Sequence, residues 1–237
     1  MASKEDNMKL LVTDYDGTMY YEKNDLKTLR ENIEALKQFK NKNMIAIATG
    51  RPYNSIKAEI DKYNIPYDYI ISSNGACLFD QYDELIYSNT IKKEIIEKTL
   101  EFLSKLPYIK KISLIDIYGK ETTNYNEIIQ IYIEINFTSI FELNKIKKEL
   151  SFLDNHPFLN ICYFFNKTDK TKGIQIIQDI HAIQSQNIYT IGNDVNDLSM
   201  LKEYNGYRVP YSYPKLLQEK LPKSSVKKLI RKIEGES

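Results

Sequence analysis

An apolar run that stops at two carboxylates is the feature that most constrains the fold of this chain. The run Leu10–Thr13 is followed at once by Asp14 and Asp16, with one residue between them, and then by a glycine and a threonine. A continuous apolar run of this length is typical of a strand covered on both faces of a parallel sheet. Because residues two apart in an extended chain point to the same side, both carboxylates should lie together at the end of a buried strand.

Two carboxylates in this position need a physical explanation. Like charges at short distance repel, so one of the two groups would be driven to take up a proton. A bound cation removes the conflict, and so does a division of labour in which one carboxylate stays ionised and the other acts as an acid. The alternative is an Asp-Gly turn with side-chain hydrogen bonds to the backbone, which accounts for Asp16 but not for Asp14.

Helical and strand patterns alternate in the next part of the chain. Apolar residues recur at helical spacing between residues 26 and 39, and short apolar runs at 44–48 and 69–72 flank a second helical segment at 53–63. This order predicts an α/β fold with a doubly wound, Rossmann-like parallel sheet. Ligands bind beyond the carboxyl ends of the strands in such sheets, and each of these strands ends in small polar residues.

A different pattern interrupts this sheet. Between residues 81 and 166, helices and strands do not alternate one by one, which is typical of an α+β module with an antiparallel sheet. The first pattern returns after Lys167. We therefore expect one core domain, built from residues 8–80 and 167–237, with an inserted α+β domain at residues 81–166.

Candidate anion-binding residues follow the second and third predicted strands. Thr49, Gly50 and Arg51 bring a hydroxyl, a flexible backbone N–H and a guanidinium to the start of a helix, where anions bind. A threonine N-cap explains the same position without a ligand. Asn74, after the third strand, fits either a plain turn or a ligand contact.

Lys172 stands at the predicted start of a later helix. A cation in the first turn opposes the helix dipole and costs about 0.3 kcal/mol or more, so its placement favours an anionic ligand. An exposed lysine behind a capping Thr171 is the alternative.

Four polar residues surround the turn after the predicted strand at 188–191, namely Asn193, Asp194, Asn196 and Asp197. A helix cap accounts for one or two of them. The remaining oxygen atoms exceed what a cap requires, and oxygen-rich clusters of this kind suit Mg²⁺.

Composition excludes several classes of function. Lys and Arg number 33 against 32 Asp and Glu, so the net charge of +1 creates no overall field that draws the protein to nucleic acid or to a membrane. No apolar run is long enough to span a bilayer, the N-terminal segment is too polar for a signal peptide, and the two cysteines are expected to be buried free thiols. We expect a cytoplasmic protein, a monomer or weak homodimer, without a histidine-based nucleophilic triad.

Taken in order, these motifs resemble those of the haloacid dehalogenase-like (HAD) hydrolase superfamily, and within it the Cof-type phosphatases with a C2 (type IIB) cap. The resemblance covers nearly the whole chain and includes residues 73–76, which are similar to the segment that leads into the Cof-type cap. The four matching motifs are Asp14–Thr18, Thr49–Arg51, Lys172–Gly173 and Gly192–Asp197.

The resemblance implies a role for each matching residue. Asp14 would attack phosphorus to give an aspartyl-phosphate, and Asp16 would protonate the leaving alcohol and then activate water. Mg²⁺ would be held by Asp14 and the backbone carbonyl of Asp16. Thr49 and Lys172 would bind the phosphoryl group, and Lys172 would also neutralise Asp14. The inserted domain would be a cap that closes over the substrate and sets its specificity.

The fourth motif departs from the family at the metal site. Asn196 would orient the phosphate and Asp197 would complete an acidic shell, but the aspartate that usually follows the glycine is replaced by Asn193. An amide oxygen can ligate Mg²⁺ without bringing a charge. Either Asn193 coordinates the ion, or Asp194 or Asp197 takes its place.

The resulting hypothesis is a Mg²⁺-dependent phosphatase that hydrolyses small phosphomonoesters, such as sugar phosphates. A phosphomutase or phosphotransferase on the same scaffold would pass the phosphoryl group to a sugar hydroxyl instead of water. A catalytically weak phosphometabolite-binding or regulatory protein is a third interpretation, and Asn193 is its only support.

Overall fold

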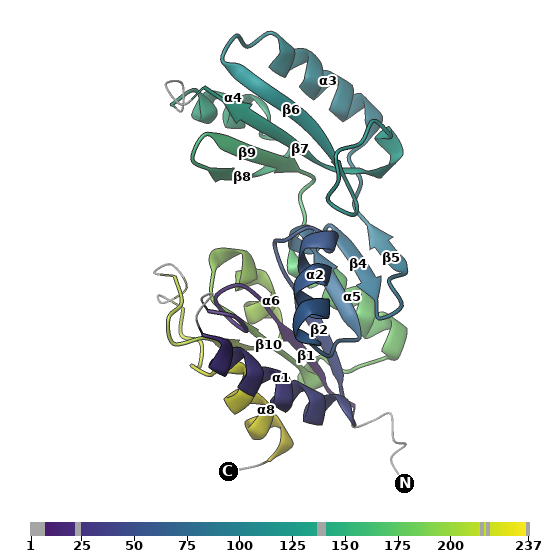
Figure 1. Cartoon of the computed structure of the whole chain (residues 1–237), viewed down its shortest axis with the longest axis vertical. Helices are drawn as coiled ribbons and strands as arrows, with labels where there is room; N and C mark the ends of the chain where they lie inside the picture. Colours follow the sequence, from purple (N-terminus) through teal and green to yellow (C-terminus); the bar gives the residue numbers. More distant parts are fainter. Residues whose placement is uncertain (1–7, 22–24, 137–140, 214–215, 217–218, 236–237) are drawn as a thin grey trace. The chain divides into compact units, whose positions relative to one another are not determined.

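The computed structural model describes residues 8–21, 25–136, 141–213, 216 and 219–235 (Figure 1). The chain divides into two compact units. We call Met1–Arg51, Ser55–Tyr87 and Asp169–Ser237 the core unit, and Pro52–Asn54 with Ser88–Thr168 the inserted unit. The polar N-terminal segment, on which the expected absence of a signal peptide depends, lies outside the described residues.

The core unit is built on a seven-stranded sheet in the order β11-β10-β1-β2-β3-β4-β5. The five strands from β11 to β3 are parallel, and β4 is antiparallel to β3. Their bounds are β1 Leu10–Thr13, β2 Met44–Ala48, β3 Tyr69–Ser72, β4 Cys77–Asp80, β5 Leu85–Ser88, β10 Ile188–Gly192 and β11 Asn205–Arg208.

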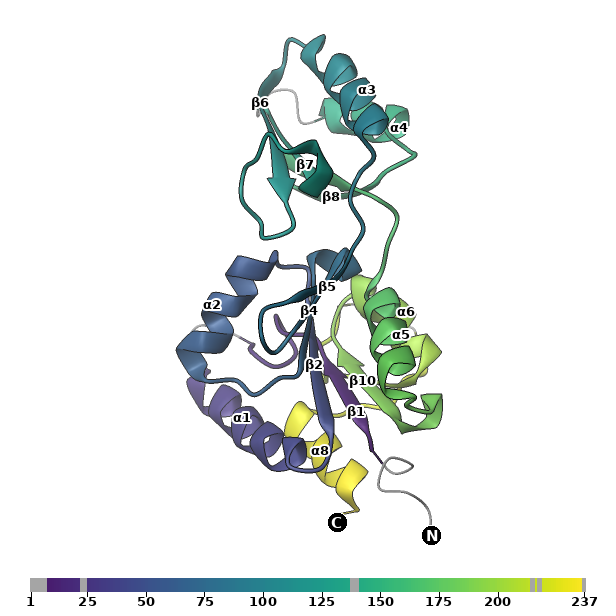
Figure 2. The same cartoon turned by 90° about the vertical axis from the view of Figure 1, so that its right-hand side faces the viewer.

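Helices cover both faces of this sheet. Figure 2 shows α1, α2 and α8 on one side of the strands and α5 and α6 on the other. A buried apolar cluster joins Val12 and Ile71 of the sheet to Ile174 and Ile177 of α5 and Met200 of α6. The helices are α1 Leu26–Lys40, α2 Tyr53–Tyr63, α5 Lys170–His181, α6 Leu198–Glu203 and α8 Val226–Glu234. The doubly wound α/β fold expected from the sequence is confirmed.

Strand register brings the expected site residues to one edge of the sheet. Thr13 pairs with Ile47 of β2 on one side and with Ile191 of β10 on the other. Because these strands are parallel, the segments that follow them all leave the sheet at its carboxyl edge. Asp14, Thr49 and Asn193 therefore come from neighbouring loops.

The inserted unit is an α+β module, as expected. Its four-stranded antiparallel sheet has the order β6-β7-β9-β8. Helices α3 and α4 contribute Ile96, Leu103 and Ile146 to a second buried cluster with Ile131 and Ile133 of β7. The elements are α3 Lys93–Ser104, β6 Ile109–Asp116, β7 Ile128–Ile135, α4 Leu143–Glu149, β8 Asp154–Phe158 and β9 Ile161–Phe165.

The hairpin of β4 and β5 lies in the core sheet, whereas the sequence pattern places the first boundary in its turn, after Asp80. Pairing of Ile70 with Phe79 keeps β4 on β3, and β5 follows as the edge strand. The chain passes to the inserted unit after Tyr87 and returns at Asp169.

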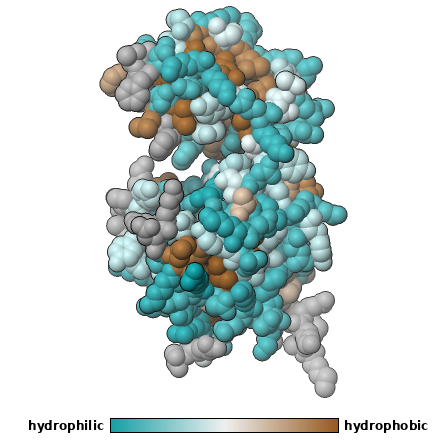
Figure 3. Space-filling model, in the orientation of Figure 1, coloured by the Kyte–Doolittle hydropathy of each residue, from teal (hydrophilic) through white to brown (hydrophobic). Residues whose placement is uncertain are grey.

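Helix polarity and the distribution of hydrophobic side chains on the surface are relevant to membrane and protein partners. Among the described residues, the helices are all too short or too polar to cross a membrane. On the face shown in Figure 3, hydrophilic side chains predominate and hydrophobic ones form small separate groups.

Candidate active site

Asp14 is held at the end of β1 in a tight turn. Its backbone N–H donates to the carbonyl of Ile191 at 3.0 Å, so the sheet fixes its position, and the residue is only 5% exposed. The chain then turns back, with the Gly17 N–H donating to the Tyr20 carbonyl at 2.8 Å. Gly17 has a φ of 76°, and a Cβ there would lie 2.2 Å from Nδ2 of Asn193. The turn therefore requires a glycine.

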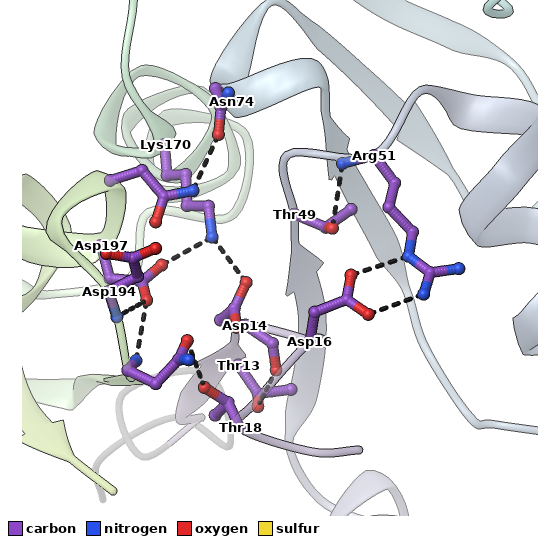
Figure 4. Close-up of polar contacts among 12 residues, drawn as sticks. Thr13, Asp14, Asp16, Thr18, Thr49, Arg51, Asn74, Lys170, Asp194 and Asp197 are labelled. Atoms are coloured by element: carbon purple, nitrogen blue, oxygen red, sulfur yellow. Dashed lines mark hydrogen bonds and ion pairs between the residues drawn. The ribbon is translucent and has the colours of Figure 1, made fainter. Parts of the chain in front are cut away.

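Lys170 is the cation that pairs with Asp14. The lysine is fully buried at the first position of α5, and its Nζ donates to Oδ1 of Asp14 at 2.7 Å and to Oδ1 of Asp197 at 2.6 Å (Figure 4). The Asp169 side chain begins the helix by accepting from the Thr171 N–H at 2.8 Å. One ammonium thus lies between two buried carboxylates from different loops.

The assignment of Lys172 to this role is wrong, because its side chain is exposed. Residues two apart on a helix point in nearly opposite directions, so Lys170 and Lys172 cannot both face the site. Lys170 lies at helical spacing with the buried Ile174 and Ile177. That periodicity is the sequence signal that identifies Lys170.

Asp197 orders the loop after β10. Its Oδ1 accepts from Lys170, and its Oδ2 accepts from the backbone N–H groups of Asn193 at 2.8 Å and Asp194 at 3.0 Å. The Asp194 side chain in turn accepts from the Val195 N–H at 2.6 Å and caps a short 3₁₀ turn. Both oxygens of Asp197 are engaged, so this residue does not fit the metal-ligand role considered for it. Asp194 acts as a cap, as in the alternative interpretation.

Burial dominates the electrostatics of this cluster. Removal from water raises the pKa of Asp14 above its ordinary range, and Lys170 opposes this rise while Asp197 adds to it. Burial alone would lower the pKa of Lys170, but attraction to the two carboxylates outweighs it and raises that pKa. The lysine therefore stays charged and favours the ionised form of Asp14.

Asp16 points away from Asp14 and toward Arg51. Nε of Arg51 donates to Oδ2 of Asp16 at 2.7 Å, and Nη2 donates to Oδ1 at 2.6 Å (Figure 4). The buried Thr49 accepts a hydrogen bond at Oγ1 from the Arg51 backbone N–H at 3.1 Å. The expected contact between the carboxylates of Asp14 and Asp16 is thus replaced by an ion pair between Asp16 and Arg51.

Two asparagines from different loops lie against each other near Gly50. Nδ2 of Asn196 donates to Oδ1 of Asn74 at 2.9 Å, and a Cβ on Gly50 would lie 3.1 Å from the same Asn74 oxygen. Asn74 has a φ of 57°, a left-handed conformation that asparagine tolerates. The structure thus brings these three expected residues together.

The oxygen atoms near Asp14 fit a divalent cation, although few of them are charged. Oδ2 of Asp14 is buried and has no hydrogen-bond partner in the described structure, and such an atom is costly unless something satisfies it. The Asn193 amide oxygen accepts from the Thr18 hydroxyl at 3.3 Å on the same side of the site. Among the described residues, no cluster of three or more His, Cys, Asp or Glu side chains could hold a metal ion. Thr18 is a site residue that the sequence interpretation did not single out.

Several known proteins are similar to this chain in sequence or in fold. A phosphatase of Bacillus subtilis for 5-amino-6-(5-phospho-D-ribitylamino)uracil, YwtE, is 25% identical over 256 residues, covering 85% of this chain and 87% of its own. The HAD-superfamily phosphatase BT1666 of Bacteroides thetaiotaomicron has a TM-score of 0.74 at 21% identity, covering 99% of this chain and 96% of its own. The subclass IIB sugar phosphatase BT4131 has a TM-score of 0.70 at 19% identity, covering 96% of this chain and 98% of its own.

The family itself follows from the sequence match. Residues 11–182 match the model of the haloacid dehalogenase-like hydrolases, which covers more than half of the chain. This match confirms the resemblance to the haloacid dehalogenase-like hydrolases, and the chain shares its fold with a phosphatase of subclass IIB. The chain belongs to the haloacid dehalogenase-like hydrolase family.

Proposed function

We propose that this protein is a Mg²⁺-dependent phosphatase that hydrolyses a phosphorylated sugar or polyol through an aspartyl-phosphate on Asp14. Its class, a HAD-type phosphatase that acts on phosphorylated small metabolites, follows from the family. The observation that carries the proposal is the carboxylate of Asp14, which has Oδ1 bonded to the buried Lys170 and Oδ2 without a partner. A carboxylate held at one oxygen presents the other as a nucleophile.

The residues of the core unit supply positioning and charge for this reaction. Asp14 Oδ2 would attack phosphorus, and Lys170 would neutralise negative charge that develops on the phosphoryl oxygens. The Thr49 hydroxyl and the backbone N–H of Gly50 would donate to those oxygens. The Asn74–Asn196 pair would offer amide groups to the remaining part of the phosphoryl group.

A magnesium ion would be held by the carboxylate of Asp14, the backbone carbonyl of Asp16 and the amide oxygen of Asn193. When bound, it would supply positive charge against the phosphoryl oxygens. The remaining candidates fit less well, because Asp194 caps a turn and Asp197 has both oxygens engaged.

Two comparisons support the substrate class. The B. subtilis relative is a phosphatase for a phosphorylated ribityl compound, and BT4131 is a sugar phosphatase. Substrates of both kinds carry the phosphate on a polyhydroxylated carbon chain.

The alternative functions are a phosphomutase or phosphotransferase on the same scaffold, and a catalytically weak phosphometabolite-binding regulatory protein. A cytoplasmic location, a monomer or weak homodimer, and an absence of nucleic-acid and membrane partners stay predictions.

The Asp14→Asn variant tests the proposal. It keeps the shape of the side chain and removes the nucleophile, so hydrolysis of p-nitrophenyl phosphate should fall by about 10³-fold or more. The Asp179→Asn variant, on the exposed face of α5, makes the same change away from the site and should keep full activity. Unchanged turnover in Asp14→Asn would overturn the assignment, and transfer of phosphate to an added hexose would favour the phosphomutase.

A further inference from the structure

Arg51 makes its strongest contacts with Asp16 and not with Asp14. Two parallel hydrogen bonds, of 2.7 and 2.6 Å, join the guanidinium to both oxygens of the Asp16 carboxylate. This bidentate geometry fixes the plane of a carboxylate as well as its position. The Asp16 side chain is half exposed, so the short loop alone leaves its direction free and the guanidinium determines it.

The guanidinium of Arg51 is in turn supported by the aromatic ring of Tyr15. It lies over the ring of Tyr15, with its central carbon 5.2 Å from the ring centre. Tyr15 is fully buried, and its hydroxyl donates to Oε2 of Glu59 on α2 at 3.1 Å. Because α2 fixes Tyr15 and Tyr15 supports Arg51, the orientation of Asp16 depends on packing inside the core unit.

We propose that Arg51 is a positioning residue for Asp16 and does not serve mainly as a phosphate ligand. The inference rests on the proposed function, because it concerns the residue that moves protons in that reaction. A phosphate ligand would be expected to lie with Thr49 and Lys170 around Asp14. Arg51 instead directs its shortest hydrogen bonds to the Asp16 carboxylate.

The chemistry gives Asp16 two tasks that need a fixed direction. As Asp14 bonds to phosphorus, the bond from phosphorus to the leaving oxygen breaks and that oxygen takes a proton from Asp16. In the second step, a water molecule attacks phosphorus and gives a proton to Asp16, and the bond to Asp14 breaks. In each step one oxygen of Asp16 exchanges a proton, which requires one of its two hydrogen bonds to Arg51 to open while the other keeps the carboxylate in place.

Leaving-group dependence separates positioning of Asp16 from phosphate binding. Nitrophenolate leaves readily as an anion, whereas phenolate is more basic and gains more from protonation. We would therefore measure kcat/KM for phenyl phosphate and p-nitrophenyl phosphate, which are close in shape. The variants are Arg51→Gln, Arg51→Lys, Asp16→Asn and the double variant Arg51→Gln/Asp16→Asn. Arg231→Gln, on the exposed face of α8, is the control.

If Arg51 acts through Asp16, Arg51→Gln should lower kcat/KM for phenyl phosphate about tenfold more than for p-nitrophenyl phosphate. Arg51→Lys should show a smaller difference between the two esters than Arg51→Gln does. The double variant should lose no more of its kcat/KM than Asp16→Asn alone. The inhibition constant of inorganic phosphate should change by less than about twofold, and melting temperatures should show that each variant is folded.

Other outcomes overturn the inference. Equal losses on both esters with weaker inhibition by phosphate would make Arg51 a phosphate ligand. Additive losses in the double variant would show that Arg51 does not act through Asp16. Failure of the unsubstituted protein to hydrolyse either ester would overturn the proposed function and this inference with it, whereas the first two outcomes leave the proposed function intact.

Discussion

Lys170 is the single residue on which the charge balance of the site depends. It is fully buried between Asp14 and Asp197, at 2.7 and 2.6 Å. Its replacement by methionine leaves two buried carboxylates without a cation, which costs roughly 3 kcal/mol of unfolding free energy. We expect Lys170→Met to lose hydrolysis of p-nitrophenyl phosphate by about 10²-fold or more and to unfold at lower urea concentration.

Lys172→Met is the matched control for this prediction. Lys172 is exposed two residues further along α5, so its loss should leave both activity and stability within experimental error. Loss of activity in Lys172→Met together with a fully active Lys170→Met would contradict the geometry and restore the interpretation made from the sequence.

The residue at position 193 determines the negative charge of the protein groups around the proposed Mg²⁺ ion. The amide oxygen of Asn193 accepts a hydrogen bond from the hydroxyl of Thr18, in the loop that follows Asp14. In the same site, Asp16 is paired with Arg51 and Asp197 with Lys170. In Asn193→Asp, the extra negative charge should strengthen Mg²⁺ binding by about tenfold, or about 1.4 kcal/mol. Isothermal titration calorimetry measures this directly.

The same charge added elsewhere provides the comparison for Asn193→Asp. Asn41→Asp lies at the exposed end of α1 and should leave the Mg²⁺ affinity unchanged. If both variants bind Mg²⁺ as the unsubstituted protein does, Asn193 is not near the bound ion and another oxygen donor must complete the site.

Sequence and structure agree at the residues that follow strands and differ in where their side chains point. Asp14 and Thr49 could be placed because a buried parallel strand has an unmistakable apolar pattern and a defined carboxyl end. The direction of Asp16 could not be foreseen, because it is set by Arg51, which comes from another loop. Such long-range pairing leaves no periodic signal in the chain.

At the scale of elements, α5 shows how an ambiguity of two residues in the start of a helix changes a functional assignment. Its N-cap is Asp169, which leaves Lys170 in the first turn and in phase with Ile174 and Ile177. A start two residues later, with Thr171 as the cap, would instead present Lys172. Helix ends are the least certain part of any interpretation from sequence, and here the contact between Lys170 and Asp14 lies at one.

The β4–β5 hairpin illustrates a second limit at this scale. Its alternating strands and polar turn look the same whether the hairpin extends the core sheet or opens the inserted module. Only the position of β5 next to β4, at the edge of the core sheet, decides the matter, and that position belongs to the tertiary structure.

At the scale of the whole molecule, each unit has its own buried cluster, so both parts contribute to stability by apolar burial. One histidine in the core unit should contribute to the pH dependence of that stability. His181, at the end of α5, has its Nε2 2.7 Å from the hydroxyl of Tyr69 on β3. Burial lowers the pKa of His181 below its ordinary 6.5, and Asp68 opposes this effect.

The sign of the pH effect follows from where the proton binds more tightly. Since the pKa of His181 is lower in the folded protein, the unfolded chain takes up the proton first, and the free energy of unfolding falls as the pH drops through 6.5 toward the lowered value. His181→Gln should remove this contribution, so between about pH 7.5 and 5.5 its free energy of unfolding in urea should fall less with acid than that of the unsubstituted protein. His156→Gln changes the other of the two histidines, which is exposed, and should keep the original slope. Asp14 titrates in both proteins, so its contribution cancels in the comparison. A slope that His181→Gln leaves unchanged would show that the contact with Tyr69 does not govern the response to acid.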